Sequence, residues 1–302
     1  MISQEICEAI FKLQLETVGK LDIYILADDY VNRRGYLGQH GASYLIRITK
    51  DHEIVNILFD TGTYSEPILF NMKTLKIDPN VIDIIMLSHR HYDHTGGLVE
   101  ILKAIGKSEV PIIAHPDIFK VNLAFSPHLI SIGLPHEVTR ESVEEIGGVW
   151  ILSKDPVTLF PGVVTTGEVS RVTTFEDDAV RGFYTIENGR IKPDKMFDDV
   201  SLIINTKEGL VIIVGCAHAG IVNIIKHSIA LTGINKIRAV IGGTHLVTAS
   251  QDRLNKTIAE FKTLGIEKLY LGHCTGLKAV SRLMHEFDEK FEPLHCGMKI
   301  SF

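Results

Sequence analysis

The residues with the clearest chemical potential lie in one short segment, SHRHYDHTGG, residues 88–97. It places three histidines and one aspartate within six residues, from His89 to His94. Neutral imidazole nitrogens and a carboxylate are the ligands that zinc and similar divalent metals prefer. The apolar run Ile84–Leu87 before the segment predicts a buried strand, and the two glycines at its end allow a sharp turn. Four potential ligands on one loop at a strand end predict a metal site.

Four further apolar runs end in a polar turn that carries a potential ligand or a supporting residue. Each turn also contains glycine, which permits close backbone approach, and the residues in question are Asp60, Cys216 with His218, His245, and His273. A single histidine at a strand end is more often structural than ligating. Together with residues 88–97, however, the four turns predict ligands that converge on one edge of a layered sheet.

The elements that position these residues are short strands that alternate with helices. Eight apolar runs predict strands, namely Leu21–Ala27, Tyr44–Ile48, Ile54–Phe59, Ile84–Leu87, Val200–Asn205, Leu210–Val214, Ala239–Ile241 and Lys268–Leu271. Ser250 is a suitable N-cap for a helix with an apolar stripe from Leu254 to Leu264, and Gly265 ends it. A second stripe predicts another helix, at Val280, Leu283, Met284 and Phe287. We expect one α/β domain over residues 1–302, with the less regular residues 110–197 as an inserted lid or subdomain.

Composition limits the classes of partner. The 302 residues are 45% hydrophobic and 23% charged, and their formal net charge of −6 leaves no basic surplus for nucleic acid. No apolar run reaches the roughly 18 residues that a membrane helix needs, and the first residues lack the pattern of a secretory signal. The cysteines do not form a disulfide framework; they are Cys7, Cys216, Cys274 and Cys296. We expect a cytoplasmic protein that acts on a small molecule, without nucleic acid or membrane partners, and the oligomeric state stays open.

Residues 89–94, HRHYDH, resemble the HxHxDH signature of the metallo-β-lactamase superfamily. FDTG at 59–62 and GHCTG at 272–276 resemble its flanking motifs. GQHGASYLI, TTGEVSR, GLVIIVGCAHAGIVN and IGGTHL occur in the same order in one subgroup. That subgroup takes its name from the archaeal 7,8-dihydropterin-6-methyl-4-(β-D-ribofuranosyl)aminobenzene-5′-phosphate synthase of methanopterin biosynthesis. The resemblance covers residues 21–302 and implies a four-layer αββα sandwich, but it fixes the reaction less firmly because one fold hosts many activities.

The resemblance implies a site for two divalent metal ions, with zinc as the first choice and iron or manganese as alternatives. By position in the signature, His89 and His91 would bind the first ion. Asp93, His94 and His273 would bind the second. The superfamily usually adds one more histidine at the first ion and an aspartate that bridges both ions.

The sequence departs from the superfamily pattern at these additional ligands. The central stretch Pro161–Glu168 contains no histidine, and GCAHAG offers Cys216 and His218 where a bridging carboxylate is common. We assign His218 as the missing imidazole ligand. Cys216 is the alternative ligand because a thiolate binds zinc well. A purely structural role, as a small buried apolar side chain that packs at a strand end, would explain Cys216 equally well. Glu168 is a further oxygen donor.

Other residues receive roles from their position in the family or, for two basic residues, from their charge. Asp60 is expected to support residues 88–97, here called the metal loop, through hydrogen bonds rather than to bind metal. Arg171 and Lys278 could meet a substrate phosphate, and a solvated surface explains both equally well. The residues placed near the substrate are His40, Ser43 and His245.

Three functions are compatible with such a site. The main expectation is a hydrolase, in particular of phosphoesters, in which two ions about 3.5–4 Å apart share a hydroxide nucleophile and Asp93 holds it as the catalytic residue. The first alternative is the synthase reaction, which joins a dihydropterin unit to an aminobenzene ribofuranosyl phosphate with loss of diphosphate. The second is a metal-binding module without catalysis, which a second metal site at Asp93, His94 and His273 disfavours.

Overall fold

Two seven-stranded sheets form the centre of the structure, a computed structural model that describes residues 13–125 and 127–302. The first sheet contains, in spatial order, β18 (Lys299–Ser301), β1 (Lys20–Ala27), β2 (Ser43–Lys50), β3 (Glu53–Phe59), β4 (Ile84–Met86), β5 (Val110–Ala114) and β8 (Gly148–Leu152). The second contains β17 (Phe291–Pro293), β16 (Lys268–Gly272), β15 (Ile237–Gly243), β14 (Gly209–Val214), β13 (Leu202–Thr206), β10 (Val163–Thr165) and β9 (Thr158–Phe160). Strands β3, β4, β5 and β8 run parallel, as do β14 to β17, so within each sheet their carboxyl ends share one edge.

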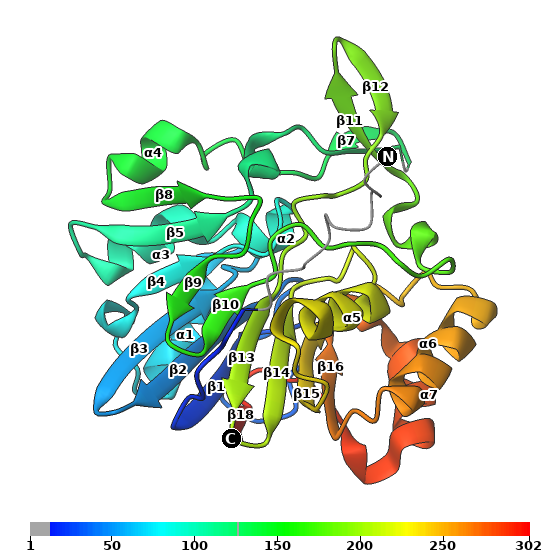
Figure 1. The fold of residues 1–302 in the computed structure, drawn as a ribbon. Helices are drawn as coiled ribbons and strands as arrows, with labels where there is room; N and C mark the ends of the chain where they lie inside the picture. Colours follow the sequence, from blue (N-terminus) through cyan, green and yellow to red (C-terminus); the bar gives the residue numbers. More distant parts are fainter. Residues whose placement is uncertain (1–12, 126) are drawn as a thin grey trace, which may run out of the picture.

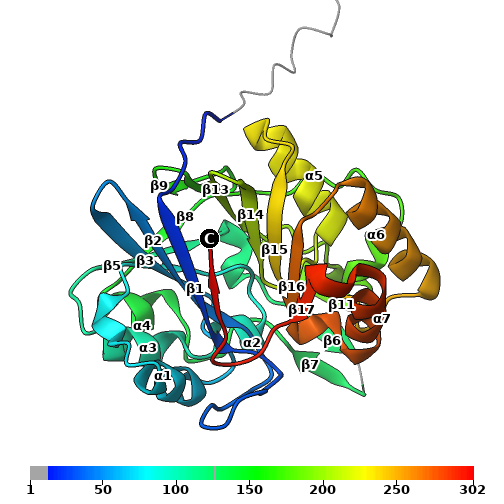
Figure 2. The same cartoon turned by 90° about the horizontal axis from the view of Figure 1, so that it is seen from below.

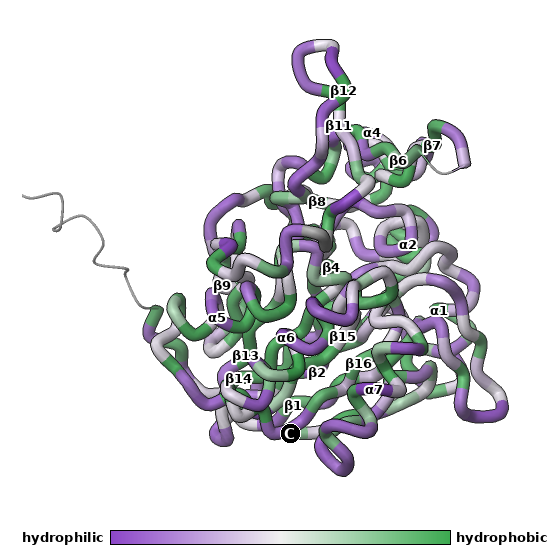
Figure 3. Tube along the Cα trace, turned by 90° about the vertical axis from the view of Figure 1, so that its right-hand side faces the viewer, coloured by the Kyte–Doolittle hydropathy of each residue, from purple (hydrophilic) through white to green (hydrophobic). Residues whose placement is uncertain are grey.

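Helices cover the outer face of each sheet, as Figures 1 and 2 show. The first sheet carries α1 (Ser65–Thr74), α3 (Leu98–Ile105) and α4 (Arg140–Glu144), and the second carries α5 (Ile221–Thr232), α6 (Gln251–Thr263) and α7 (Leu277–Phe287). One apolar cluster fills the space between the sheets, and two others pack each sheet against its own helices. Figure 3 shows hydrophobic residues along much of the central strands. The expected αββα sandwich is therefore confirmed.

The predicted elements are present with ends that differ by a few residues. All eight predicted strands belong to the two large sheets. Ser250 caps α6, because its hydroxyl oxygen accepts the Arg253 N–H at 3.1 Å. The second apolar stripe lies on α7. Local patterns identified these elements because each buries one continuous apolar face.

The described strands of residues 110–197 divide among three sheets. Strands β5 and β8 belong to the first sheet, and β9 and β10 to the second. A separate four-stranded sheet contains β12 (Arg190–Pro193), β11 (Phe183–Glu187), β6 (Leu123–Phe125) and β7 (Leu129–Ser131). The β11–β12 hairpin projects from the body of the molecule in Figure 1, and its tip is hydrophilic in Figure 3. A lid or subdomain bounded at residues 110 and 197 stays a prediction.

The structure also bears on the cysteines and on the membrane. Cys216, Cys274 and Cys296 are free thiols, whereas Cys7 lies outside the described residues. Across residues 13–125 and 127–302, none of the helices has the length and apolar character to span a bilayer.

Candidate functional site

The candidate ligands and their supports lie just beyond the carboxyl ends of strands from both large sheets. They are Asp29 after β1, Asp60 after β3, residues 88–94 after β4, Cys216 and His218 after β14, His245 after β15, and His273 after β16. Phe59 pairs with Met86 and Gly243 with Gly272, so the turns after these neighbouring strands begin at the same level. This edge is where open α/β sheets usually bind ligands, because the strand-end turns converge there.

The turns of the two sheets approach each other closely and hold a strained backbone. A Cβ atom at Gly215 would lie 2.1 Å from the Ser88 hydroxyl oxygen, so only glycine fits between β14 and the metal loop. Four non-glycine residues in the turns at this edge of the sheets have φ between +45° and +59°, namely Asp60, Ala217, His245 and His273. Each such conformation costs on the order of 1–3 kcal/mol, and strain of this kind concentrates at functional sites.

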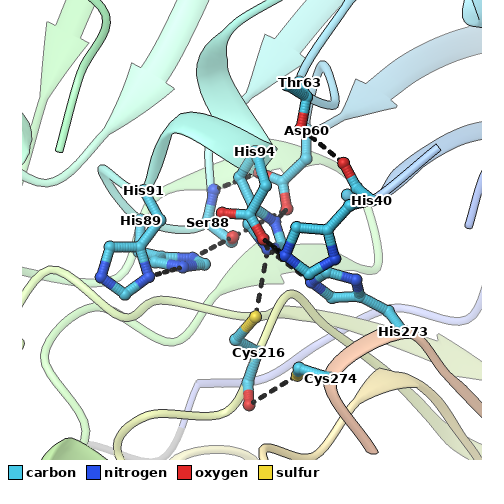
Figure 4. A network of polar contacts seen from close by, with 12 residues as sticks. His40, Asp60, Thr63, Ser88, His89, His91, His94, Cys216, His273 and Cys274 are labelled. Carbon is cyan, nitrogen blue, oxygen red and sulfur yellow. Dashed lines mark hydrogen bonds and ion pairs between the residues drawn. The ribbon is translucent and has the colours of Figure 1, made fainter. Parts of the chain in front are cut away.

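His94 lies at the centre of the cluster (Figure 4). Its Nδ1 is 2.7 Å from Asp60 Oδ2, and its Nε2 is 3.1 Å from Cys216 Sγ and 3.2 Å from His273 Nε2. Asp60 also accepts the Ser88 N–H and hydroxyl, both at 2.7 Å, so its contacts are those of a supporting residue. The Nδ1 of His273 is 2.7 Å from Asp29 Oδ1. With both Nδ1 protons given to carboxylates, the neutral rings would turn their two Nε2 lone pairs toward each other. Burial opposes protonation of His273, but neighbouring groups, among them Asp29 and Asp93, outweigh it and raise the pKa of His273 well above its usual value, so a metal ion would displace a proton from this ring.

His89 and His91 form a second pair of facing nitrogens. Ser88 Oγ, which donates to Asp60, accepts from His89 Nδ1 at 2.8 Å. His91 Nε2 is 3.0 Å from Asn122 Oδ1. This leaves His89 Nε2 and His91 Nδ1 facing each other at 3.0 Å. A ring nitrogen of His218 lies within 4.8 Å of the corresponding atoms of His89 and His91.

Divalent metal ions fit this set of donors. Two nitrogens bound tetrahedrally at 2.0–2.1 Å from zinc lie about 3.3 Å apart, which is close to the 3.2 Å between His94 and His273. The facing lone pairs of two neutral rings repel unless a cation lies between them, and the nitrogens of His89/His91 and of His94/His273 are placed so that a metal ion could lie between them. The donors of His89, His94 and Cys216 also lie within 4.8 Å of one another, so Cys216 lies beside both pairs.

The electrostatics of the cluster favour the same donor set. Burial lowers the pKa of His89 well below its usual value and that of His91 to about 3, so both rings are neutral at pH 7. Burial opposes the ionisation of Asp93, but His94 and His273 outweigh it and hold the pKa of this carboxyl well below its usual range. Burial raises the pKa of the Cys216 thiol, and coordination to a metal would deprotonate it.

A pocket of about 340 Å³ opens over the cluster. Its polar lining includes His91, Asp93, Cys216, His218 and His273, and its apolar and aromatic lining includes Tyr30, Tyr92, Ile132, Phe183 and Val247. The Phe183 ring centroid lies 4.9 Å from that of His91 and 5.3 Å from that of His218. Among the described residues, the pocket lining contains no lysine or arginine. The positive charge for an anionic group bound here would come from metal ions and from histidines such as His40, whose pKa is raised by its hydrogen bond to Asp29.

The residues that the sequence placed near the substrate fall in two different locations. His40 and His245 line the pocket. His40 lies between two carboxylates, with Nδ1 3.0 Å from Asp29 and Nε2 3.3 Å from Asp93, and the hydrogen bond to Asp29 raises its pKa. The expectation for Ser43 is wrong: its side chain is fully buried and donates to the Asp60 carbonyl oxygen at 2.8 Å.

The structure does not bring the remaining predicted groups to the pocket lining. Glu168 Oε1 lies 2.9 Å from His115 Nε2, a contact that ties the turn after β10 to the end of β5. Arg171 donates to the backbone oxygen of Lys195. Lys278 is exposed in the first turn of α7. Among the described residues, these three are absent from the lining of the 340 Å³ pocket.

Three of the residues that contact the predicted histidine ligands were not predicted from the sequence. Asp29 lies two residues after the end of β1, and Asp60 follows β3 directly, so a search of the turns at strand ends would have found Asp29 as well. Asn122 and Phe183 border short strands of the irregular segment, where no apolar period indicates which side chains point inward. Their contacts with His91 depend on long-range folding alone.

Comparisons with known proteins relate the chain to characterised families. Residues 38–169 match the family model described as the metallo-beta-lactamase superfamily. The 7,8-dihydropterin-6-methyl-4-(beta-D-ribofuranosyl)-aminobenzene-5′-phosphate synthase of Methanocaldococcus jannaschii is 48% identical over 95% of this chain and 100% of its own length. An uncharacterised protein of the same organism is 31% identical over 86% of this chain and 93% of its own length. The crystal structure of Tm1679, a metal-dependent hydrolase of the beta-lactamase superfamily, has a TM-score of 0.77 and 28% identity over 93% of this chain and 98% of its own.

These comparisons overturn the main functional expectation. The sequence favoured a phosphoester hydrolase, with the synthase as the alternative. A relative that is 48% identical over nearly the whole chain is named as the synthase, so the hydrolase expectation is wrong and the alternative has the better support. The role of Asp93 as the residue that holds a hydroxide nucleophile belonged to hydrolysis and is withdrawn with it.

Proposed function

Because this chain belongs to the metallo-β-lactamase superfamily and is 48% identical to the synthase of Methanocaldococcus jannaschii, we propose that it catalyses the reaction for which that synthase is named. That identity, which extends over the full length of the relative, is the observation that carries the proposal. In the reaction that the resemblance implies, the aminobenzene nitrogen attacks the methylene carbon of a dihydropterin methyl diphosphate. A C–N bond forms, the C–O bond to diphosphate breaks, and the nitrogen loses a proton.

The proposal includes two divalent ions, of which zinc best suits the donors. His89, His91 and His218 would hold one ion, and Asp93, His94 and His273 the other. Cys216 would bind beside the second ion, since its Sγ lies 3.1 Å from His94 Nε2. When bound, the ions would supply the positive charge that stabilises the departing diphosphate.

The remaining pocket residues would favour transfer to an amine over transfer to water. Tyr30, Tyr92, Ile132 and Val247 give the pocket apolar surface that would displace water when a substrate binds. Phe183 adds an aromatic face beside the histidine cluster, and aromatic rings gain about 0.5–1.5 kcal/mol from stacking beyond their burial. Both substrates carry a ring that can use such a face.

We expect the metal-loaded protein to form the coupled product from the dihydropterin methyl diphosphate and 4-(β-D-ribofuranosyl)aminobenzene 5′-phosphate, with one diphosphate released per product. Mass spectrometry would follow the product, and an enzyme-coupled assay would follow diphosphate. Removal of the ions by a chelator should stop both signals, and added zinc should restore them.

The matched control for this assay is the dihydropterin diphosphate without the amine. Since the proposal requires the amine nitrogen as the nucleophile, this control should release almost no diphosphate. Release at an equal rate with and without the amine would contradict the proposed transfer.

We expect cobalt(II) to separate the roles of His218 and Cys216. His218→Ala should lower cobalt occupancy as severely as His89→Ala, because both remove an imidazole from the first ion. Cys216→Ser should remove the near-ultraviolet sulfur-to-cobalt absorption, whereas Cys274→Ser is the matched control and should keep it. Loss of the absorption in Cys274→Ser alone would assign the sulfur ligand to Cys274, and full occupancy in His218→Ala would remove His218 from the ligand set.

A further inference from the structure

A chain of buried polar side chains links His91 to the four-stranded sheet. Asn122, directly before β6, places Oδ1 3.0 Å from His91 Nε2 and Nδ2 2.7 Å from Asp194 Oδ2. Asp194, directly after β12, also pairs with the guanidinium of Arg90. Asn122 is 0% exposed and Arg90 1% exposed. The Asn122 amide and the Arg90 guanidinium are therefore shielded from bulk solvent.

The surroundings of Asn122 fix the orientation of its amide. Either orientation would fit the same planar outline, so hydrogen-bond partners must decide between them. Asp194 is paired with Arg90, and an ionised carboxylate can only accept hydrogen bonds. The amide nitrogen of Asn122 must therefore face Asp194, which leaves its oxygen toward His91.

We propose that Asn122 is a positioning residue that selects the tautomer of His91. An amide oxygen only accepts, so the proton of the neutral ring must lie on Nε2. The unprotonated atom is then Nδ1, which faces His89 Nε2 at 3.0 Å. With the other tautomer, a proton would lie between the two rings and would have to leave before a metal ion could bind. The inference rests on the metal-binding role proposed for His91 and does not depend on the substrate.

Arg90 extends this support to the backbone of the metal loop. Its N–H donates to Asp198 Oδ2 at 3.0 Å, and its guanidinium pairs with Asp198 and Asp194. The Asp194 N–H in turn donates to the Phe183 carbonyl oxygen at 2.9 Å. The strands that bring Phe183 to the pocket thus also hold the residue between His89 and His91.

Histidine ¹⁵N NMR on the metal-free protein tests the tautomer directly. We expect the His91 spectrum of the wild-type protein to show the proton on Nε2. Asn122→Ala should give a mixture of both tautomers. It should also lower the affinity for the first zinc ion by about 10–100-fold, measured by competition with a chromophoric chelator. Asn80→Ala is the matched control, because the Asn80 amide donates to the Ile105 carbonyl oxygen at 2.9 Å, away from the histidine cluster.

Each outcome decides the proposal separately from the synthase reaction, because neither measurement involves a substrate. A proton on His91 Nδ1 in the wild-type protein would overturn it, even if Asn122→Ala failed to fold. Weaker zinc binding with an unchanged tautomer would reduce Asn122 to a packing role and also overturn it. A shifted tautomer with weaker zinc binding, and no change in Asn80→Ala, would support it.

Discussion

Replacing His94 with alanine is expected to reduce the rate of product formation by more than about 100-fold. Loss of a residue that only supports a metal ligand lowers activity by about 10–100-fold, and loss of a ligand itself should cost more. The His94 ring lies between Asp60, Cys216 and His273, and its centroid is 4.2 Å from that of His89. Its loss would therefore remove a ligand of the second ion and open a void beside the first. We expect the variant to retain at most one ion per chain, as measured by elemental analysis.

The control for His94→Ala is His115→Ala, which also removes a buried histidine. His115 is 1% exposed and contacts Glu168 rather than the cluster. Its replacement should leave metal content near two ions per chain even if stability falls. Two ions in both variants, with activity unchanged in His94→Ala, would remove His94 from the proposed site.

Replacing Arg90 with methionine is expected to lower the free energy of unfolding by about 3–5 kcal/mol. Arg90 pairs with both Asp194 and Asp198, and its side chain is 1% exposed. Methionine would fill part of the space but would leave two buried carboxylates without a counter-charge, which is more costly than losing the pair. Urea unfolding followed by circular dichroism would measure the change.

Arg140→Met is the matched control for this measurement. Arg140 contacts Glu144 at 3.8 Å on the surface of α4, and exposed pairs of this kind contribute about 0.5 kcal/mol or less. If the two variants unfolded at the same urea concentration, Arg90 would not carry the stabilising role that its burial indicates.

Sequence patterns predicted the parts of the site that depend on local structure. A buried strand followed by a polar turn is a local signal, and it located the metal loop, His218, His245 and His273 at one edge of the sheets. The prediction that Ser43 lies near the substrate was wrong because position in the family does not show to which face of a strand a side chain points. The Asn122–Asp194 contact spans 72 positions and lies in the least regular segment, so no local pattern could indicate it.

The reaction was predicted wrongly for a different physical reason. In the sequence, aromatic residues make up only 7% of the chain, which favours hydrolysis over a reaction that needs an aromatic pocket for a pterin. Composition averages over the whole molecule, whereas folding concentrates Tyr30, Tyr92 and Phe183 in one pocket. The sequence also lacks a glycine-rich phosphate loop of the GxxxxGK(S/T) kind, but this is weak evidence against the synthase because the ions proposed for the cluster can neutralise a diphosphate.

The order in which the chain is synthesised has a consequence for binding of the second of the two proposed ions. His273 receives its support from Asp29, 244 positions earlier in the sequence, and β18 completes the first sheet by pairing with β1. Contacts between residues so far apart in the sequence form slowly, and a chain leaving the ribosome cannot make them until its last strands emerge. His273 is also a proposed ligand of the second ion. We therefore expect nascent chains that end before His273 not to bind this ion, so that it would bind only when translation is nearly complete.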